Sequence, residues 1–387
     1  MRPHPLLWLA AGLALAASPL FAGDPGQRLV ATNRLDQARP SETVEVPAAA
    51  LAPRLRPQDL ATLAILDAAG RPILSQAVDE NGDGVPDRLV FQADFAPSEK
   101  KVFTLRPGER RPYLREDFRV YGRFVRERFD DFAWENDRIA HRMYGPALET
   151  WEKEPLTSSA VDVWSKRTRR LVVNDWYLVD DYHHDHGEGG DFYSAGKSRG
   201  CGGSGVFADG RLFVSRNFQT SRVLANGPIR LVFELAYAAW DAGGVRVSEK
   251  KRVTLDAGSN LNRFESDHSI PGGRTPVWAA GIKKAKDADV RAEAARGWLR
   301  TWEPVAGAAG NLGCGVVAEP GSIDRVTEAD GNVLVISKDG APARYWAGFG
   351  WDRSGDFASR EDWDLYLEQA ARRLRSPVTV EVQEERP

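Results

Sequence analysis

The chain has 387 residues, of which 42% are hydrophobic and 28% are charged, a balance typical of a folded globular protein that excludes wholesale disorder. Its 55 acidic side chains slightly outnumber its 52 basic ones, and the net charge of −3 offers no basic excess to hold a nucleic-acid backbone, so DNA or RNA binding is not expected. This length suggests two domains, and the 36 glycines and 23 prolines favour a turn-rich, mainly β structure.

The first 22 residues have the features of an export signal. Arg2 supplies a positive start, an apolar run follows from Leu6 to Leu15, and Ala22 before Gly23 forms an acceptable cleavage site. The run is too short to predict a membrane span, and no later stretch is apolar enough to cross a bilayer. We therefore expect cleavage near Ala22 and a mature protein that is periplasmic or secreted.

Residues 23–108 are predicted to form a small antiparallel β-sandwich, because short strand-forming runs alternate with turn residues. A charged, proline-bearing segment at residues 107–112 is expected to connect it to the rest of the chain. The expected strands are Glu42–Val46, Leu63–Leu66, Arg88–Gln92 and Lys101–Leu105.

A loop in this domain has the pattern of a calcium site. Glycine at position 6 permits the sharp turn that brings oxygen ligands together, as hard cations require. Position 12 is Val90, where an EF-hand has glutamate, so we expect a structural Ca²⁺ between two strands rather than an EF-hand. The alternative is a turn that binds nothing. The oxygen-bearing residues at positions 1, 3, 5 and 9 are Asp79, Asn81, Asp83 and Asp87.

Residues 109–387 are predicted to form a large, mainly antiparallel β-sandwich, because many strands are spaced by Gly, Asp or Asn turns. One helix is expected at Ser359–Leu374, where helix-forming residues carry apolar side chains at helical spacing. The expected strands are Arg119–Phe124, Arg138–Tyr144, Arg211–Phe218, Ile229–Ala236, Val245–Leu255, Leu261–Ser266 and Asn332–Ile336.

Residues 132–145 combine charged, amide and phenol side chains. If this segment forms one strand, alternate residues share a face. Two guanidinium groups, an amide and a phenol on one face would make a cradle for a carboxylate-bearing sugar. The alternative is an edge strand with salt bridges. The residues of the expected cradle are Asn136, Arg138, Arg142 and Tyr144.

A glycine-rich polar stretch from residue 174 to residue 203 contains three of the six histidines. Such a sequence is typical of a functional loop on a rigid scaffold, and its imidazole and phenol groups can transfer protons. In an alternative interpretation, His184 and His186 bind zinc with Glu188 or Asp191, although this is not a defined zinc spacing. The candidates for catalysis or substrate binding in this stretch are Trp176, Tyr177, His184, His186, Tyr193 and Arg199.

The two cysteines, Cys201 and Cys314, each stand between glycines. Export permits a disulfide between them. The alternative is a nucleophilic thiol, for which the sequence provides no activating feature.

Several of these segments resemble a secreted bacterial family called domain of unknown function 4861. The resemblance covers nearly the whole mature chain and includes the Asp79–Asp87 loop with the following Phe91. It implies a galactose-mutarotase-like supersandwich for the large domain and a role in polysaccharide utilisation, often beside enzymes that act on uronic-acid glycans. No organic cofactor is expected. The segments that carry it are Phe132–Arg138, Met143–Leu148, His184–Gly189 and Ser198–Gly203.

The resemblance and the residues together lead to the hypothesis of a lyase that cleaves uronic-acid poly- or oligosaccharides by β-elimination. His184 or His186 would be the base, and Tyr193, Tyr144 or Tyr177 the acid. The carboxylate would be held by Asn136, Arg138 and Arg142, with Arg199 in reserve and with Trp176 and Tyr177 as further substrate contacts.

Two other classes of function stay open. A glycoside hydrolase would use a carboxylate pair drawn from Glu135, Asp137, Glu188 and Asp191. A non-catalytic glycan-binding protein would stack sugars on Trp176, Trp346 or Trp351.

Overall fold

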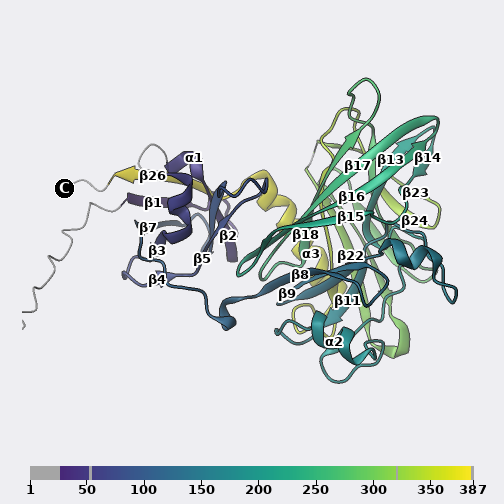
Figure 1. The fold of residues 1–387 in the computed structure, drawn as a ribbon, viewed down its shortest axis with the longest axis horizontal. Coiled ribbons are helices and arrows are strands. Elements are labelled where there is room, and N and C mark those ends of the chain that lie inside the picture. Colours follow the sequence, from purple (N-terminus) through teal and green to yellow (C-terminus); the bar gives the residue numbers. More distant parts are fainter. Residues whose placement is uncertain (1–26, 52–54, 320, 385–387) are drawn as a thin grey trace, which may run out of the picture.

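The computed structural model describes residues 27–51, 55–319 and 321–384. Strands dominate these residues and assemble into a small and a large body (Figure 1). The strands within each sheet pair antiparallel, which confirms the predicted all-β, mainly antiparallel class. The predicted export signal and its cleavage site near Ala22 lie outside the described residues. No helix in the described ranges is long and apolar enough to span a membrane.

The small body is a sandwich of two sheets around one apolar core. Its five-stranded sheet has the order β26 (Thr379–Glu384), β1 (Gln27–Thr32), β7 (Lys100–Arg106), β3 (Ala64–Leu66) and β4 (Pro72–Ile73). Its three-stranded sheet has the order β2 (Arg39–Pro47), β6 (Arg88–Phe95) and β5 (Ser75–Val78).

The large body contains three sheets. The eight-stranded sheet has the order β15 (Thr220–Asn226), β16 (Arg230–Ala242), β17 (Val245–Asp256), β18 (Leu261–Ser269), β25 (Arg344–Trp351), β22 (Asn311–Ala318), β21 (Trp298–Pro304) and β20 (Asp289–Glu293). A five-stranded sheet has the order β14 (Arg211–Phe213), β13 (Cys201–Ala208), β19 (Trp278–Lys283), β24 (Asn332–Ser337) and β23 (Ile323–Ala329). The other five-stranded sheet has the order β12 (Gly189–Gly190), β11 (Asp162–Lys166), β10 (Ile139–Met143), β9 (Asp131–Asn136) and β8 (Val120–Val125).

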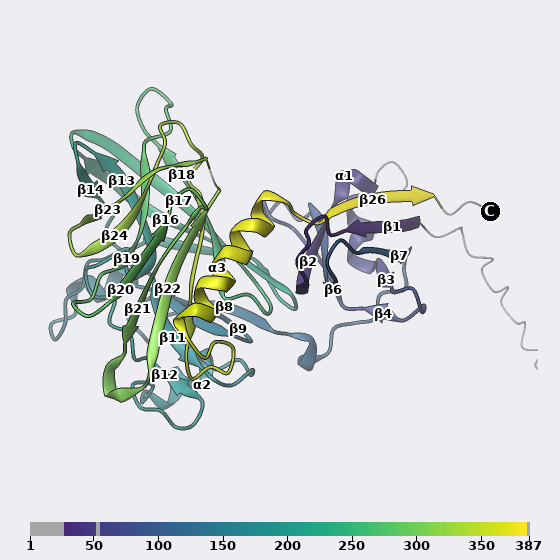
Figure 2. The same ribbon diagram turned by 180° about the vertical axis from the view of Figure 1, so that it is seen from behind.

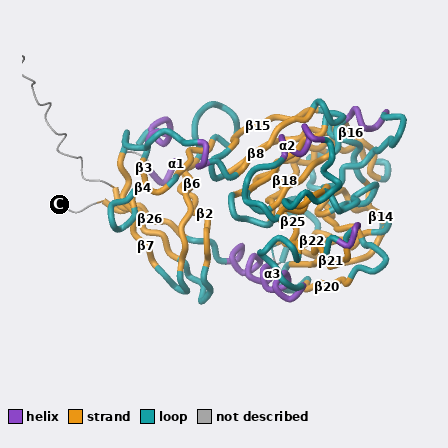
Figure 3. The backbone as a smooth tube through the Cα atoms, turned by 90° about the horizontal axis from the view of Figure 1, so that it is seen from below, coloured by secondary structure: helices purple, strands orange, loops and turns teal. Residues whose placement is uncertain are grey.

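All the described helices but one are short (Figure 3). The longer helix follows the last strand of the large body. The α-helices are α1 (Ala48–Leu51), α2 (Val173–Val179) and α3 (Arg360–Arg375). The 3₁₀ helices are Pro57–Thr62, Arg115–Asp117, Pro146–Thr150 and Ala306–Ala308.

Helix α3 confirms the predicted helix and is capped by its own sequence. The Ser359 hydroxyl accepts the N–H of Asp362 at 3.2 Å, and the Asp362 carboxylate accepts the N–H of Ser359 at 3.0 Å. The helix packs closely on β22 because Gly313 and Gly315 lack side chains. A Cβ on Gly315 would lie 2.7 Å from a methyl group of Leu367.

The chain returns to the small sandwich at its end, as Figure 2 shows. After α3, β26 pairs antiparallel with β1, with Leu29 opposite Val382. The small sandwich therefore takes its edge strand from residues 379–384, which the sequence predicts to belong to the large domain.

The two bodies are held together by buried polar contacts. The Gln76 side chain accepts the N–H groups of Ile229 and Arg230 at 2.9 and 2.8 Å and donates to the Arg230 carbonyl at 2.9 Å. Gln92 donates to the Ala257 carbonyl at 2.8 Å. These contacts fix the small sandwich against the start of β16 and the end of β17.

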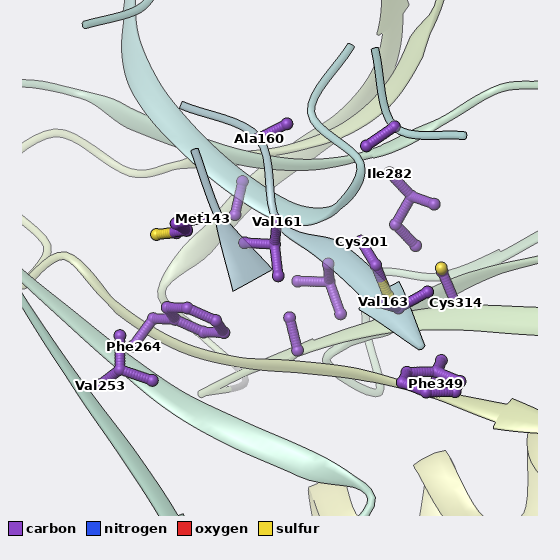
Figure 4. Packing of buried hydrophobic residues seen from close by; sticks show 14 of the residues in the cluster. Met143, Ala160, Val161, Val163, Cys201, Val253, Phe264, Ile282, Cys314 and Phe349 are labelled. Atoms are coloured by element: carbon purple, nitrogen blue, oxygen red, sulfur yellow. The ribbon is translucent and has the colours of Figure 1, made fainter. Parts of the chain in front are cut away.

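The core of the large body contains both cysteines, which are buried free thiols (Figure 4). The Cys201 thiol donates to the Gly348 carbonyl at 3.0 Å. Burial raises the pKa of Cys314. A thiol that is buried and held protonated is a poor nucleophile.

Candidate active site

A buried carboxylate positions helix α2, which lies where the sequence predicts a loop. Glu135 of β9 accepts the backbone N–H groups of Val172 and Val173 at 2.8 and 2.7 Å, at the end where the helix dipole favours negative charge. Lys166 of β11 pairs with Glu135 at 2.6 Å. Since Glu135 is fully buried, it supports α2 and does not face a substrate.

Two of the three clustered histidines share one carboxylate just after α2. Asp181 contacts Nδ1 of His184 through Oδ1 and Nε2 of His186 through Oδ2, the latter at 2.9 Å. The imidazoles are 77% and 65% exposed. Hydrogen bonds from His184 and then from His186 lower the pKa of Asp181. An ionised carboxylate thus orients both rings through one nitrogen each.

A pocket of about 240 Å³ opens beside this pair. It brings an indole face together with two imidazoles, a guanidinium and three carboxylates. Arg170 forms ion pairs with Glu188 and Asp175, and its hydrogen bonds, the one to Glu188 first, raise its pKa. The lining residues are Arg170, Asp175, Trp176, Val179, Asp181, Tyr182, His184, His186, Glu188 and Gly189.

Aromatic packing supports the pocket wall. The fully buried Trp164 of β11 stacks on Tyr182 with ring centroids 4.9 Å apart and also contacts Trp176, at 5.7 Å. Tyr177 packs edge-on against Trp164 at 4.7 Å. Tyr177, which was also a predicted substrate contact, is buried and does not line the pocket, whereas Trp176 does.

Beneath the aromatic layer, one arginine holds a cluster of three aspartates. Arg142 of β10 donates to Asp162 at 2.9 Å and to Asp191 at 3.1 Å, and lies 3.9 Å from Asp131. The Tyr144 hydroxyl donates to Asp162 at 3.1 Å. All five side chains are buried, so Arg142 and Tyr144 stabilise this network rather than contact solvent.

Burial of the network shifts its protonation. Burial raises the pKa of Asp131 to about 7 and, together with repulsion from Asp162, the pKa of Asp191 to about 8. The folded state therefore retains protons that the unfolded chain releases above about pH 4. The stability from these two carboxyls is fully present below that pH and is lost as the pH rises through about 7 to 8.

We predict that Asp131→Asn flattens the pH dependence of stability. An amide keeps an oxygen to accept the Gly145 N–H, a bond of 2.9 Å in the wild type, but it does not titrate. Melting temperatures should fall between about pH 5 and about pH 9 for the wild type and fall less for the variant. Parallel curves for the two proteins would contradict the proton assignment.

The segment of the expected carboxylate cradle is a hairpin, and not one strand. The Asn136 side chain accepts the N–H groups of Arg138 and Ile139 at 2.8 and 2.9 Å, which reverses the chain between β9 and β10. Arg138 turns away to pair with Asp356, while Arg142 lies at the far end of β10, opposite Ala133. The structure therefore does not bring Asn136 and Arg138 together with Arg142.

Two further predicted residues lie in the interior of the large sandwich. Arg199 is buried, donates to the Ser159 hydroxyl at 3.1 Å, and has its pKa lowered to about 10 by burial. Tyr193 is also buried, with the Lys283 ammonium 5.1 Å from its ring centre. Neither residue lines the histidine pocket.

The calcium-like loop closes on its own backbone. The Asp79 carboxylate accepts the N–H groups of Gly82 and Gly84, and Asp83 accepts the N–H of Val85 at 2.8 Å. The Asn81 side chain donates to Asp87 at 3.2 Å. At least one side-chain oxygen of each predicted ligand thus accepts a hydrogen bond from within the loop.

Calcium binding by this loop stays a prediction. Added Ca²⁺ should raise the melting temperature of the wild type, because an ion that binds only the folded state stabilises it by about 2.7 kcal/mol at a hundred times its Kd. Asp83→Ala should abolish the increase. A wild-type melting temperature that neither Ca²⁺ nor a chelator changes would show that the loop is a turn alone.

The carboxylates considered for zinc are engaged elsewhere. Glu188 pairs with Arg170, and Asp191 lies under the surface against Arg142. Across residues 27–51, 55–319 and 321–384, no group of three or more His, Cys, Asp or Glu side chains is arranged to hold a metal ion.

Sequence reasoning missed Arg170, Asp181 and Tyr182 as members of the site. Asp181 and Tyr182 directly precede the histidines, so their adjacency was an available signal. Arg170 carried no signal, because its position depends on how β11 leads into α2. Asp131 and Asp162 were also missed, since only packing places them around Arg142.

The chain belongs to the family described as domain of unknown function (DUF4861), whose model matches residues 31–380. It is 32% identical, over 392 residues, to the uncharacterized protein P7 of Formosa agariphila, an alignment that covers 95% of this chain and 98% of that protein.

Two solved structures resemble the fold. A glycosyl hydrolase family 38 protein from Enterococcus faecalis matches with a TM-score of 0.51 and 12% identity, over 94% of this chain and 48% of that one. An alpha-mannosidase from Enterococcus faecalis V583 matches with a TM-score of 0.50 and 11% identity, over 94% and 46%. The chain thus spans about half the length of these proteins, and at such identities the likeness shows the fold alone.

Proposed function

We propose that the protein is a carbohydrate-active lyase that cleaves uronic-acid-containing poly- or oligosaccharides by β-elimination in the histidine pocket. The observation that carries this proposal is the exposed pair of imidazoles held by one carboxylate beside a tryptophan. A carboxylate that orients an imidazole is a common arrangement for a general base. Trp176 offers an indole face on which a sugar ring can stack.

The proton balance of elimination suits two imidazoles on one aspartate. One neutral ring removes the proton at C5, the C–H electrons form the C4=C5 double bond, and the C4–O bond breaks. The second ring, protonated beforehand, gives its proton to the leaving oxygen. Asp181 stabilises whichever ring is charged, and Arg170 is the cation of the pocket, which would hold the uronate carboxylate by exchanging its ion pair with Glu188 or Asp175.

The acid assignment differs from the one expected from sequence. Tyr193, Tyr144 and Tyr177 are all buried and outside the pocket; Tyr182 lines it but is also buried, and its hydroxyl accepts a hydrogen bond from Arg128 at 2.7 Å. The second histidine, with Tyr182 as the nearest phenol, therefore takes the role first given to those three tyrosines.

The class of ligand is also supported by the comparisons. Two proteins with this fold are described as a family 38 glycosyl hydrolase and an alpha-mannosidase, which act on sugars.

We also propose export, with cleavage near Ala22. Mass spectrometry of the amino-terminal peptide of the protein purified from its native host tests this cleavage. A peptide that still begins at residue 1 would contradict it.

Hydrolysis is the second candidate, favoured by the three carboxylates in the pocket. Asp175, Asp181 and Glu188 could supply an acid and a base or nucleophile. Glu135 and Asp137 are not part of this set: the first is buried under α2, and the second accepts the Gly258 N–H at 2.6 Å.

Product analysis separates the candidates. The protein would be incubated with polygalacturonate, alginate and glucuronoxylan, and ultraviolet absorbance of the unsaturated uronate followed together with new reducing ends. Lyase action predicts that both signals rise in equal amounts. Reducing ends without absorbance would replace the lyase by a hydrolase, and binding without either signal would leave a glycan-binding protein.

A further inference from the structure

A second cavity, of about 380 Å³, lies between the two bodies. Strand β2 of the small sandwich forms one wall, and the outward face of β16, β17, β18 and β25, with α3, forms the other. It shares no lining residue with the histidine pocket.

The register of the large sheet aligns three cleft residues in a row. Thr254 stands opposite Arg263, and Arg263 opposite Trp346, so the three project from one face of neighbouring strands. Their chain neighbours Phe264 and Tyr345 point into the core, where both are fully buried. An indole face thus lies beside a guanidinium and a hydroxyl.

The cleft also contains a buried charge with unused hydrogen-bonding capacity. Arg230 is 97% buried and donates to Asp256 at 2.7 Å and to Glu45 at 2.6 Å. Its Nη1 lies 3.6 Å from Oε1 of Glu80, a residue behind the lining of the cleft, and both atoms are buried without a hydrogen-bond partner among the described residues. Arg263 lies 3.7 Å from the same oxygen. These separations are too long for direct hydrogen bonds.

This arrangement favours a ligand hydroxyl. A hydroxyl both donates and accepts, so one such group can donate to a carboxylate that lines the cleft, such as Glu45, and accept from the Arg263 guanidinium. The lining has three arginines and three carboxylates, so no excess positive charge is available for a phosphate. Alternating donors and acceptors beside an indole are typical of sites that bind the hydroxyls and the apolar face of a sugar ring.

We propose that the interdomain cleft is a second carbohydrate site, which binds one hydroxyl-rich saccharide unit with Trp346 as its stacking platform. This inference rests on the proposed function only for the class of ligand, and not for the chemistry. Because both bodies line the cleft, a bound saccharide bridges the small sandwich and the large sheet.

Affinity electrophoresis through gels containing polygalacturonate, alginate, glucuronoxylan or mannan tests the proposal with the full chain. Trp346→Ala should raise the apparent Kd for at least one glycan, obtained from the retardation of the band, about tenfold. Gln369→Trp should do the same by filling the cleft from the half-buried surface of α3, without removing a core group. Leu365→Trp is the matched control, because Leu365 is 56% exposed on the same helix and outside the cleft, and its retention should equal that of the wild type.

The outcome is separable from that of the proposed function. Loss of retention in both cleft variants, with retention unchanged in His184→Ala, supports the second site even if no glycan is cleaved. Equal retention of the wild type, Trp346→Ala and Gln369→Trp overturns the inference even if cleavage is observed, as does the absence of wild-type retention in every gel.

Discussion

Replacing His184 and His186 together by alanine is expected to lower kcat on a cleaved uronic-acid glycan by about 10³-fold, because the variant loses both proton-transfer groups of the pocket. Retention on the same glycan should persist, since Trp176 and the interdomain cleft are unchanged. The measurement is the initial rate of unsaturated product formation at saturating substrate.

His183→Ala is the matched control for this loss. His183 belongs to the same segment and is 62% exposed, but it does not line the pocket. Its rate should stay close to that of the wild type. Asp181→Asn should lower kcat, because an amide would hold the two imidazoles less firmly than an ionised carboxylate does. A double variant that retained full turnover would remove the histidines from the mechanism.

Arg142→Met is expected to cost about 3–5 kcal/mol of stability, the range for breaking a buried charge network by removing one partner. The change leaves Asp131, Asp162 and Asp191 buried without their shared cation. Protonation of the aspartates relieves part of this repulsion, so the loss should be larger at high pH than at low pH. Urea denaturation at two pH values measures it.

The control for this prediction is Arg138→Met on the same hairpin. Arg138 is 31% exposed, and its partner Asp356 keeps a second arginine, Arg169, at 2.7 Å. A loss of at most about 1 kcal/mol is expected for such a partly exposed pair. Similar losses for the two variants would show that the Arg142 network is no more important than a surface ion pair.

Local patterns in the sequence predicted much of the fold. Strands β6, β16 and β17 were found because their residues favour strands and are bounded by turn residues. Helix α3 was found from its apolar spacing. The pairing of β26 with β1 could not be predicted, since it joins the two ends of the chain and depends on tertiary packing. The hairpin at Asn136 was missed because a side-chain cap, without glycine or proline, makes the turn.

The candidate site was predictable where it is continuous in sequence. His184, His186 and Trp176 lie within one short stretch, and the structure places them around one pocket. The prediction of a carboxylate cradle was wrong because it required one continuous strand. In the structure, Arg138 pairs with Asp356, which lies 218 residues away in the sequence. Long-range contacts of this kind have no local signature in the sequence.

The most direct test of elimination is the mass of the products formed in ¹⁸O-labelled water. The protein would be incubated with the glycan that it depolymerises, and the oligosaccharides analysed by mass spectrometry. The lyase mechanism predicts unsaturated products whose masses sum to that of the substrate, with no enzymatic incorporation of ¹⁸O beyond the slow exchange at reducing ends seen in a control without enzyme. Hydrolysis would instead add one ¹⁸O-labelled water for each bond cleaved, so the summed mass of the products would exceed that of the substrate. That result would contradict the lyase mechanism and assign the pocket to hydrolysis.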